Sequence, residues 1–241
     1  MLFFYIRHGD PIYNPDSLTP LGERQAEALA KRLARHGLDK VYSSTSNRAQ
    51  LTAKPTCEIL KLEPELLDFA NEKYAWRDFH EELEDGRTRF LFLSPNFMDL
   101  CHEKEVRDLG ERWYDHPAFE NTSCKAGMER IYEESDKLFA DLGYEHIRHT
   151  GKYKVTKPND QRVALFAHAG FGMAFLSCLL DIPYPVICTQ FDLTHSSMTV
   201  IDFKERDGYC IPRVLTWSSD SHLYREGLPC PYSACNYTAY F

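Results

Sequence analysis

The chain opens with a short apolar run that stops abruptly at polar residues, and this junction limits the folds open to it. Leu2 to Ile6 suits a buried strand better than a helix, because Arg7-His8-Gly9-Asp10 follows at once. A second junction of this kind occurs where Val163 to Phe166 runs into Ala167-His168-Ala169-Gly170. We therefore expect two buried strands, each with a histidine at its carboxyl end.

Helical segments follow both of these strands. Thr19 and Pro20 are typical of a helix N-cap and first position, and apolar residues then recur on one face until Gly37. Phe171 to Leu180 is apolar throughout, as in a helix that is covered on every side. This alternation predicts an α/β fold, a three-layer sandwich whose mostly parallel central sheet has helices on both faces.

Further strands are expected between and after these elements. Leu38 to Tyr42 is a clear apolar run, and Leu66 to Phe69 is a weaker one. Near the end of the chain, Met198 to Phe203 and Cys210 to Thr216 flank the turn residues Asp207-Gly208. This last pair is predicted to form a hairpin.

The stretch from about residue 76 to residue 121 has a different pattern from the rest of the chain. It is dense in charged and aromatic side chains and shows little of the alternation typical of strands. We expect a single domain over residues 1–241 that carries this stretch as a mainly helical insertion over the active site. The polar segment from Lys152 to Asp160 is expected to be a solvated loop.

Composition and charge narrow the possible partners. With 43% hydrophobic and 27% charged residues, the chain has the composition of a soluble globular protein. A net charge of −8 argues against a broad surface for nucleic acid or anionic membrane, so an anionic ligand must be met by local cations. No apolar run has the length of a signal-peptide core or a membrane span, and we expect a cytoplasmic protein. The oligomeric state is left open.

The cysteines and the C-terminal tail carry weaker signals. The eight cysteines lack CxxC spacing and are interpreted as mostly reduced thiols, although Cys230 and Cys235 are close enough in sequence to pair. From Gly227 onward the chain has no charged side chain and several tyrosines. This tail is expected to pack on its own domain, with contact to a partner as the alternative.

Several cationic side chains follow predicted strands at the point where each strand ends. Arg7 and His8 follow the first strand, Arg48 lies in the helix start after Ser43-Ser44, and His168 follows a later strand. Ligands of open α/β sheets bind beyond the carboxyl ends of the strands, so these side chains are expected to converge. Two arginines and two histidines around one point suit a phosphate, because guanidinium groups bind its oxygens in pairs.

In this order and spacing, the chain resembles the histidine phosphatase superfamily, the phosphoglycerate mutase-like proteins with an RHG motif. The resemblance extends over nearly the whole chain outside the insertion. It rests on Arg7-His8-Gly9-Asp10, Asn14, Leu18 to Ala26, Ser43-Ser44, Arg48, Thr52-Ala53, Ala167-His168-Ala169-Gly170 and Ser197 to Ile201.

The resemblance implies a phosphomonoester hydrolase, a metal-independent phosphatase of the histidine acid phosphatase type. His8 would become a phosphohistidine, while Arg7, Arg48 and His168 stabilise the charge of the transferring phosphoryl group. Attack requires a neutral imidazole, which the nearby arginines favour, and a fixed partner on the other ring nitrogen would select the attacking tautomer. Neither a cofactor nor a metal is expected.

The resemblance also supplies residues around this core. Glu72, in Ala70-Asn71-Glu72-Lys73-Tyr74, best matches the general acid that protonates the leaving group. Further phosphate contacts are expected from Gly9, Asn14 and the backbone amide of Ala169. The substrate is expected to be a phosphorylated small molecule.

Some features leave alternatives open. Glu81, Glu82, Glu84 and Asp85 are rival acids, although their clustering is typical of a solvated helical face. His146 and His149 lack a carboxylate or thiolate at ligand spacing, which argues against a metal site.

His195 is either a substrate contact or a loop cap, and the second interpretation is favoured. After Glu72 the chain departs from the better-known mutases, which weakens any transfer of substrate identity.

Two other functions remain open from the sequence. A mutase-type isomerase would return the phosphoryl group to a second hydroxyl of the substrate. A phospholigand-binding protein would keep the pocket without turnover. The complete set of Arg7, His8, Arg48, Glu72 and His168 favours hydrolysis over loss of catalysis.

Overall fold

A six-stranded central sheet organises the computed structural model, which describes residues 1–229. Its strand order is β14-β11-β1-β10-β4-β5, and β11 runs against the other five strands. The prediction of a mostly parallel α/β sheet is confirmed. The six strands are β1 (Leu2–Arg7), β4 (Lys40–Ser44), β5 (Glu65–Leu67), β10 (Arg162–Ala167), β11 (Met198–Asp202) and β14 (Arg213–Ser219).

Alternation along β1 divides the interior into two cores. Phe3 and Tyr5 point into one hydrophobic cluster, and Phe4 and Ile6 point into another on the opposite face of the sheet. All four side chains are fully buried, as expected for a central strand covered on both sides.

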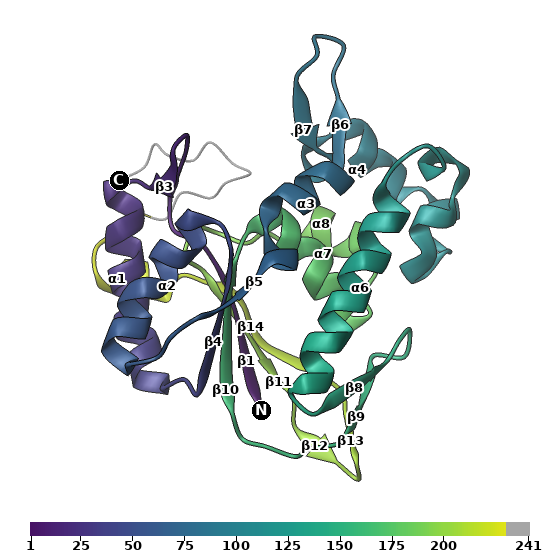
Figure 1. Ribbon diagram of the computed structural model, residues 1–241. Coiled ribbons are helices and arrows are strands. Elements are labelled where there is room, and N and C mark those ends of the chain that lie inside the picture. The colour runs from purple at the N-terminus through teal and green to yellow at the C-terminus, as the bar shows by residue number, and fades with distance from the viewer. Residues whose placement is uncertain (230–241) are drawn as a thin grey trace.

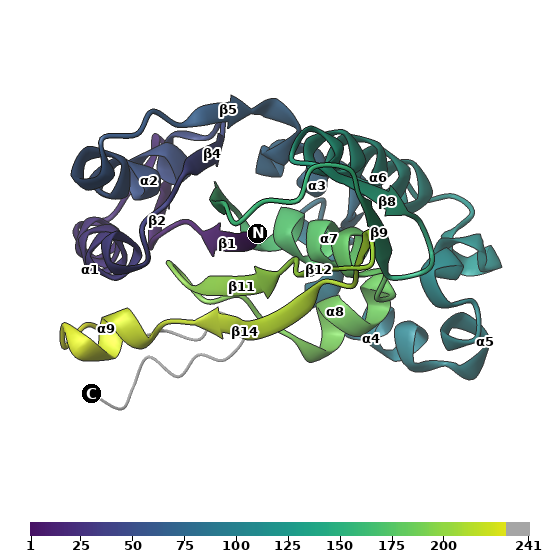
Figure 2. The same ribbon diagram turned by 90° about the horizontal axis from the view of Figure 1, so that it is seen from below.

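Helices cover both faces of the sheet (Figures 1 and 2). On one face lie α1 (Pro20–His36) and α2 (Asn47–Leu60), and on the other lie α6 (Cys124–Asp141) and α7 (Ala169–Leu180). The start of α1 is as predicted, since the Thr19 hydroxyl accepts a hydrogen bond from Gly22 N–H at 3.0 Å. The predicted three-layer sandwich is confirmed.

Shorter elements connect these layers. The β2–β3 hairpin, the 3-10 helix η1 and α3 lie early in the chain, whereas α8 follows α7 and α9 packs against α1. Their bounds are β2 (Pro11–Tyr13), β3 (Asp16–Leu18), η1 (Asp68–Ala70), α3 (Glu72–Asp78), α8 (Tyr184–Gln190) and α9 (Ser221–Arg225).

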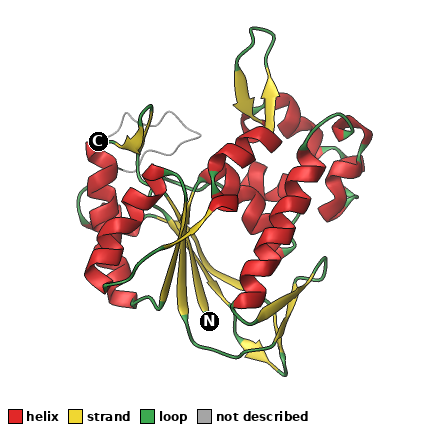
Figure 3. Cartoon of the chain, viewed as in Figure 1, coloured by secondary structure: helices red, strands yellow, loops and turns green. Residues whose placement is uncertain are grey.

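The insertion is mainly helical, but it begins with a hairpin that the sequence pattern did not reveal (Figure 3). Glu81 and Glu82 therefore lie on a strand, and the predicted helical face for this acidic cluster is wrong. The two strands are three residues each, too short to show a strand period. The elements are β6 (His80–Glu82), β7 (Thr88–Phe90), η2 (Leu91–Leu93), α4 (Pro95–His102), α5 (Lys104–Arg107), η3 (Gly110–Asp115) and η4 (Pro117–Phe119).

Aromatic packing joins the insertion to the body of the molecule. The Trp113 ring lies 4.8 Å from Phe119 and 5.5 Å from Tyr184 of α8, measured between centroids. Phe97 completes this cluster, and all four side chains are buried. The insertion thus has an aromatic core that is continuous with the larger hydrophobic cluster.

A small second sheet includes two segments for which the sequence predicted a different structure, the loop from Lys152 and the turn at Asp207-Gly208. Its strands are β8 (Tyr144–Ile147), β9 (Lys152–Val155), β12 (Glu205–Arg206) and β13 (Tyr209–Cys210). The segment expected as a loop from Lys152 therefore begins with a strand, which pairs with β8 and β13. The predicted antiparallel pairing of β11 with β14 is present, although β14 begins only at Arg213. The Asp207-Gly208 turn itself closes the short β12–β13 hairpin, which lies between β11 and β14 in the chain.

The helices and cysteines of the described residues bear on two further expectations. No helix in residues 1–229 combines the length and apolar character needed to cross a membrane. Cys230, Cys235 and the tail residues 230–241 lie outside the described residues, whereas the other six cysteines are free and buried.

A buried charge network links the second sheet to α6 and α7. The His146 side chain is 1% exposed and lies between Asp136 Oδ1 at 2.9 Å and Asp181 Oδ2 at 3.1 Å. Burial favours the neutral ring, but the hydrogen bonds to Asp136 and Asp181 outweigh it and raise the pKa of His146 to about 9. His146 is therefore charged in the folded protein at neutral pH.

We expect His146→Gln to lower the free energy of unfolding by about 3 kcal/mol at pH 7, because the buried Asp181 carboxylate loses its cation, whereas Asp136 keeps Arg148. The folded-state pKa is raised, so this stabilisation is complete below the ordinary histidine pKa and is lost as pH rises through about 9. Urea unfolding at pH 7 and pH 10 measures the difference between the two proteins. It should shrink at pH 10.

His102→Gln, which changes an exposed histidine of α4, is the control and should leave stability unchanged at both pH values. A stability difference for His146→Gln that stays constant from pH 7 to pH 10 contradicts a charged histidine in this network.

Candidate active site

The pairing of β1 with β10 places two histidines side by side. Arg7, the last residue of β1, is opposite Ala167, the last residue of β10, and His8 N–H donates to Ala167 O at 2.9 Å. His8 and His168 therefore leave the sheet at the same level, with ring centroids 5.1 Å apart. The predicted convergence of these side chains at the carboxyl ends of the strands is present in the structure.

His8 is held in one tautomer by its own neighbour. Its Nδ1 lies 2.7 Å from Gly9 O, an atom that can only accept, so Nδ1 carries the proton and Nε2 keeps its lone pair. Burial lowers the pKa of His8 well below its usual range, and His168 and Arg7 lower it further. The ring is therefore neutral, as nucleophilic attack requires.

The backbone of Gly9 fixes the position of the loop that carries His8. Its N–H donates to Thr52 Oγ1 at 3.0 Å, and a Cβ at this position would lie 2.7 Å from Gly22 O. Only glycine permits this close approach of the His8 loop to the start of α1.

The two arginines are fixed by different partners. Arg7 Nη1 donates to Leu193 O, and its Nη2 lies 2.7 Å from His195 Nε2. Arg48 Nη1 donates to Asp16 Oδ1 at 2.7 Å, while the other oxygen of Asp16 accepts from Asn47 N–H at the start of α2. Asp16 thus positions Arg48 and caps its helix at the same time.

The His168 ring stands edge-on to the His8 ring and is fully buried. Its Nε2 is 2.8 Å from Ser44 Oγ at the end of β4, whereas its buried Nδ1 has no partner among the described residues. Burial, with Arg48 and Arg7 close by, lowers the pKa of His168 well below its usual range. A neutral ring with one unsatisfied nitrogen is the kind of buried polar group that a ligand satisfies.

Glu72 is held at the start of α7. Its two carboxylate oxygens accept from Gly170 N–H and Phe171 N–H, each at 2.9 Å. Burial raises the pKa of Glu72, although these amides and the two arginines Arg48 and Arg7 act in the opposite direction. A carboxyl with a raised pKa that is also stabilised as an anion can both give and take a proton.

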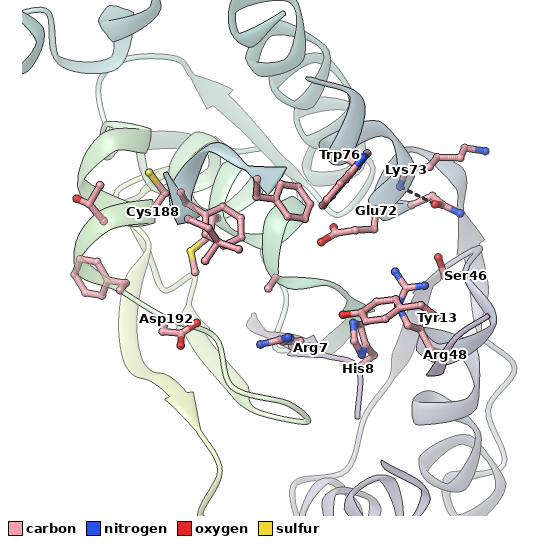
Figure 4. Close-up of a pocket in the computed structure, with 18 of the residues that line it drawn as sticks. Arg7, His8, Tyr13, Ser46, Arg48, Glu72, Lys73, Trp76, Cys188 and Asp192 are labelled. Carbon is pink, nitrogen blue, oxygen red and sulfur yellow. Dashed lines mark hydrogen bonds between the residues drawn. The ribbon is translucent and has the colours of Figure 1, made fainter. Parts of the chain in front are cut away.

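A cavity of about 990 Å³ opens at this point (Figure 4). It is lined by five of the predicted site residues, namely Arg7, His8, Arg48, Glu72 and Ala169. The Ala169 amide is the first of α7 and has no acceptor within that helix.

The structure places the other predicted residues elsewhere. His168 is fully buried and does not line the cavity, and Gly9 packs on Gly22. Asn14 lies in the exposed turn between β2 and β3 and does not line the cavity, which its neighbours Tyr13 and Asp16 do. The sequence motif alone does not show which residues of the turn line the cavity.

The rival acids lie away from the cavity. Glu81 is bound to Arg89, and Glu82, Glu84 and Asp85 belong to the exposed β6–β7 hairpin. Within residues 1–229 no group of three or more His, Cys, Asp or Glu side chains is arranged to hold a metal ion.

His195 is the clearest residue that sequence reasoning undervalued. Its ring lies 5.7 Å from the His8 ring, and its Nδ1 faces Asp10 Oδ1 at 3.4 Å. Burial, with Arg7 nearby, lowers the pKa of His195 to about 3, so the ring is neutral and accepts from Arg7. The sequence showed only a histidine before a strand, because Arg7 is 188 positions away.

Part of the sequence matches a known protein family. Residues 3–95 match the sequence model of the histidine phosphatase superfamily (branch 1). The resemblance to the histidine phosphatase superfamily that the sequence predicted is confirmed over these residues. No curated protein sequence matches the chain.

Solved structures of several phosphatases share the fold of this chain. Phosphoserine phosphatase from Entamoeba histolytica, bound to phosphoserine, has a TM-score of 0.59 at 19% identity and covers 92% of this chain and 98% of its own. The mycobacterial glucosyl-3-phosphoglycerate phosphatase has a TM-score of 0.58 at 20% identity, covering 90% and 99%. The α-ribazole phosphatase from Shigella flexneri has a TM-score of 0.59 at 19% identity, covering 91% and 97%. At this level of sequence identity, these similarities show a shared fold.

We expect His195→Ala to weaken inhibition by orthovanadate about tenfold, because Arg7 loses a charge-assisted hydrogen bond that orients it. His195→Gln keeps a carbonyl acceptor and should recover part of the loss. Inhibition constants of the three proteins, measured with a generic aryl phosphate, test this.

His36→Ala, at the exposed end of α1, is the control and should bind vanadate as the intact protein does. Equal inhibition constants for His195→Ala and the intact protein would show that Arg7 does not depend on His195.

Proposed function

We propose that this protein is a metal-independent phosphomonoester hydrolase that acts through a phosphohistidine on His8, with Glu72 as the general acid. The observation that carries the proposal is the hydrogen bond from His8 Nδ1 to Gly9 O, 2.7 Å long, in a ring kept neutral by burial. This bond leaves Nε2 with a free lone pair beside two arginines at the end of a large cavity.

In the first step, His8 Nε2 attacks phosphorus as the bond to the ester oxygen breaks. Glu72 gives its proton to that oxygen, so the alcohol leaves neutral. The carboxylate that remains is stabilised by Gly170 N–H and Phe171 N–H. The product of this step is a phosphohistidine on His8.

In the second step, water attacks the phosphohistidine and gives a proton to the Glu72 carboxylate. The P–N bond breaks, inorganic phosphate forms, and both His8 and Glu72 return to their starting states. The raised pKa of Glu72 suits both directions of this proton transfer.

Fixed cations supply the charge stabilisation that this transfer needs. Arg7 and Arg48 line the cavity beside His8, and the Ala169 amide opens the N-terminus of α7. We infer that a phosphoryl oxygen is the missing partner of His168 Nδ1. Gly9 packs on Gly22 and Asn14 is exposed in the β2–β3 turn, so the resemblance alone supports them as phosphate contacts.

Support for hydrolysis over a mutase reaction comes from the fold relatives, which are phosphatases of phosphoserine, glucosyl-3-phosphoglycerate and α-ribazole substrates by name. A phosphorylated small molecule is the substrate that we propose here too. The insertion, as a lid of the single domain, contributes Trp76, Phe90 and Leu93 to the cavity wall. Cytoplasmic location stays a prediction.

Hydrolysis of p-nitrophenyl phosphate in excess chelator is expected for the intact protein and lost in His8→Ala, because the alanine variant has no nucleophile. Phosphate release measures turnover, and acid-labile phosphate on the protein after rapid quenching measures the intermediate. Activity in both proteins would exclude His8, and activity that appears only with a bisphosphorylated primer would favour the mutase.

We expect Glu72→Gln to lower kcat/KM about 100-fold for an alkyl phosphate and little for p-nitrophenyl phosphate, whose leaving group needs no proton. Because its pKa is raised, Glu72 stays protonated above the ordinary carboxyl range, and kcat/KM should fall as pH rises through that raised pKa. Neutral His8 should sustain activity below the ordinary histidine pKa.

The pH profile of the alkyl phosphate in both proteins tests this assignment, since ionisation of the substrate is common to them. Glu82→Gln on the exposed hairpin is the matched control and should behave as the intact protein. An unchanged profile in Glu72→Gln would assign the acid to another group.

A further inference from the structure

The cavity has two chemically different parts. Arg7, His8, Arg48 and Glu72 lie at one end, and the wall beyond them is formed largely by apolar side chains from the insertion, α7 and the segment around α8. That wall comprises Trp76, Phe90, Phe92, Leu93, Met98, Met173, Cys188 and Phe191.

Three of these apolar side chains are unusually exposed. Trp76 is 39% exposed, Phe191 41% and Leu93 49%, although all three border the same cavity. A contiguous apolar surface open to water is characteristic of a ligand-binding site. The Trp76 ring stands edge-on to Phe90 at 4.6 Å, and Phe90 stacks on Phe92 at 4.9 Å, so the aromatic part of the wall is already packed without a ligand.

Phe90 also ties this wall to the catalytic end. A Cβ on Gly170 would lie 2.7 Å from two atoms of the Phe90 ring and 2.9 Å from Glu72 Oε1. The apolar wall therefore begins directly beside the proposed acid. The part of the substrate that is attached to the ester oxygen would therefore lie against aromatic rings immediately beyond Glu72.

Charge on the wall disfavours a second anionic group. Among the described residues that line the cavity, the cations are Arg7, Arg48 and Lys73. The two arginines are at the phosphate end, and Lys73 is an exposed residue whose Nζ lies 3.4 Å from Asp68. Asp192, next to Phe191, also lines the cavity and interacts electrostatically with Arg7, so it offers no attraction to a substrate carboxylate.

We propose that the substrate is a phosphomonoester of a bulky, uncharged, apolar alcohol that contains a flat ring system. The inference rests on the proposed hydrolase function and specifies its substrate class. It separates this protein from a phosphatase of phosphoserine or of a phosphoglycerate, whose substrates carry a carboxylate beside the phosphate.

The test compares primary alkyl phosphates, so that the leaving groups are of one kind. We expect kcat/KM for 2-(2-naphthyl)ethyl phosphate to exceed that for ethyl phosphate about 100-fold, because the ring system leaves water for an apolar wall. Phosphoserine should be no better than ethyl phosphate. A gain below about tenfold for the naphthyl compound, or a preference for phosphoserine, overturns the inference.

A matched pair of substitutions locates the preference. Leu93→Ser removes an exposed leucine from the wall, and Leu215→Ser removes one that is 58% exposed on β14, away from the cavity. The ratio of naphthylethyl to ethyl kcat/KM should fall roughly fivefold in Leu93→Ser and stay constant in Leu215→Ser. Equal ratios in the two variants overturn the assignment of this wall to the substrate.

Binding separates failure of this inference from failure of the proposed function. Calorimetry with 2-(2-naphthyl)ethylphosphonate and ethylphosphonate, which lack the scissile ester oxygen, needs no turnover. Tighter binding of the naphthyl compound in a protein that hydrolyses no phosphate ester refutes the hydrolase and upholds the apolar site. Hydrolysis of all three esters with equal binding of the phosphonates upholds the hydrolase and refutes the apolar site.

Discussion

The parallel pairing of β1 with β10 is the constraint on which the site depends. Its register sets Arg7 opposite Ala167, so His8 and His168 leave neighbouring strands at the same level. Since β1 and β10 are both covered on two faces, a slip of one residue would move every buried side chain into the wrong core. The position of the two histidines is therefore enforced by the hydrophobic interior and not by the site itself.

Charged groups at the end of this sheet are each held by a partner from elsewhere in the chain. Asp16 binds Arg48, His195 binds Arg7, and the first amides of α7 bind Glu72. Burial without such partners would be costly, because each group loses its hydration. The result is a set of donors that is oriented before a phosphoryl group arrives, which is how electrostatic stabilisation of a transferring group works.

The sequence predicted the elements with strong local signals. Thr19 and Pro20 marked the start of α1, and the apolar runs marked β1, β10 and α7, because each signal acts over a few residues. The same approach missed β6, β7 and β9, which are three or four residues long. Strands of that length are stabilised by their neighbours in space, and their own residues carry too short a pattern to predict them.

For the site, the sequence by itself determined which chemical groups are present and that Arg7, His8 and His168 follow strand ends. From the sequence, the nearby arginines indicated that His8 is neutral, as attack requires, but they did not show how that state is fixed. The tertiary structure decided the rest: the Nδ1 bond to Gly9 O, the role of His195 beside Arg7, the outward turn of Asn14 and the apolar wall. These depend on contacts between residues far apart in the chain, whose energies arise from burial and distance and leave no local pattern.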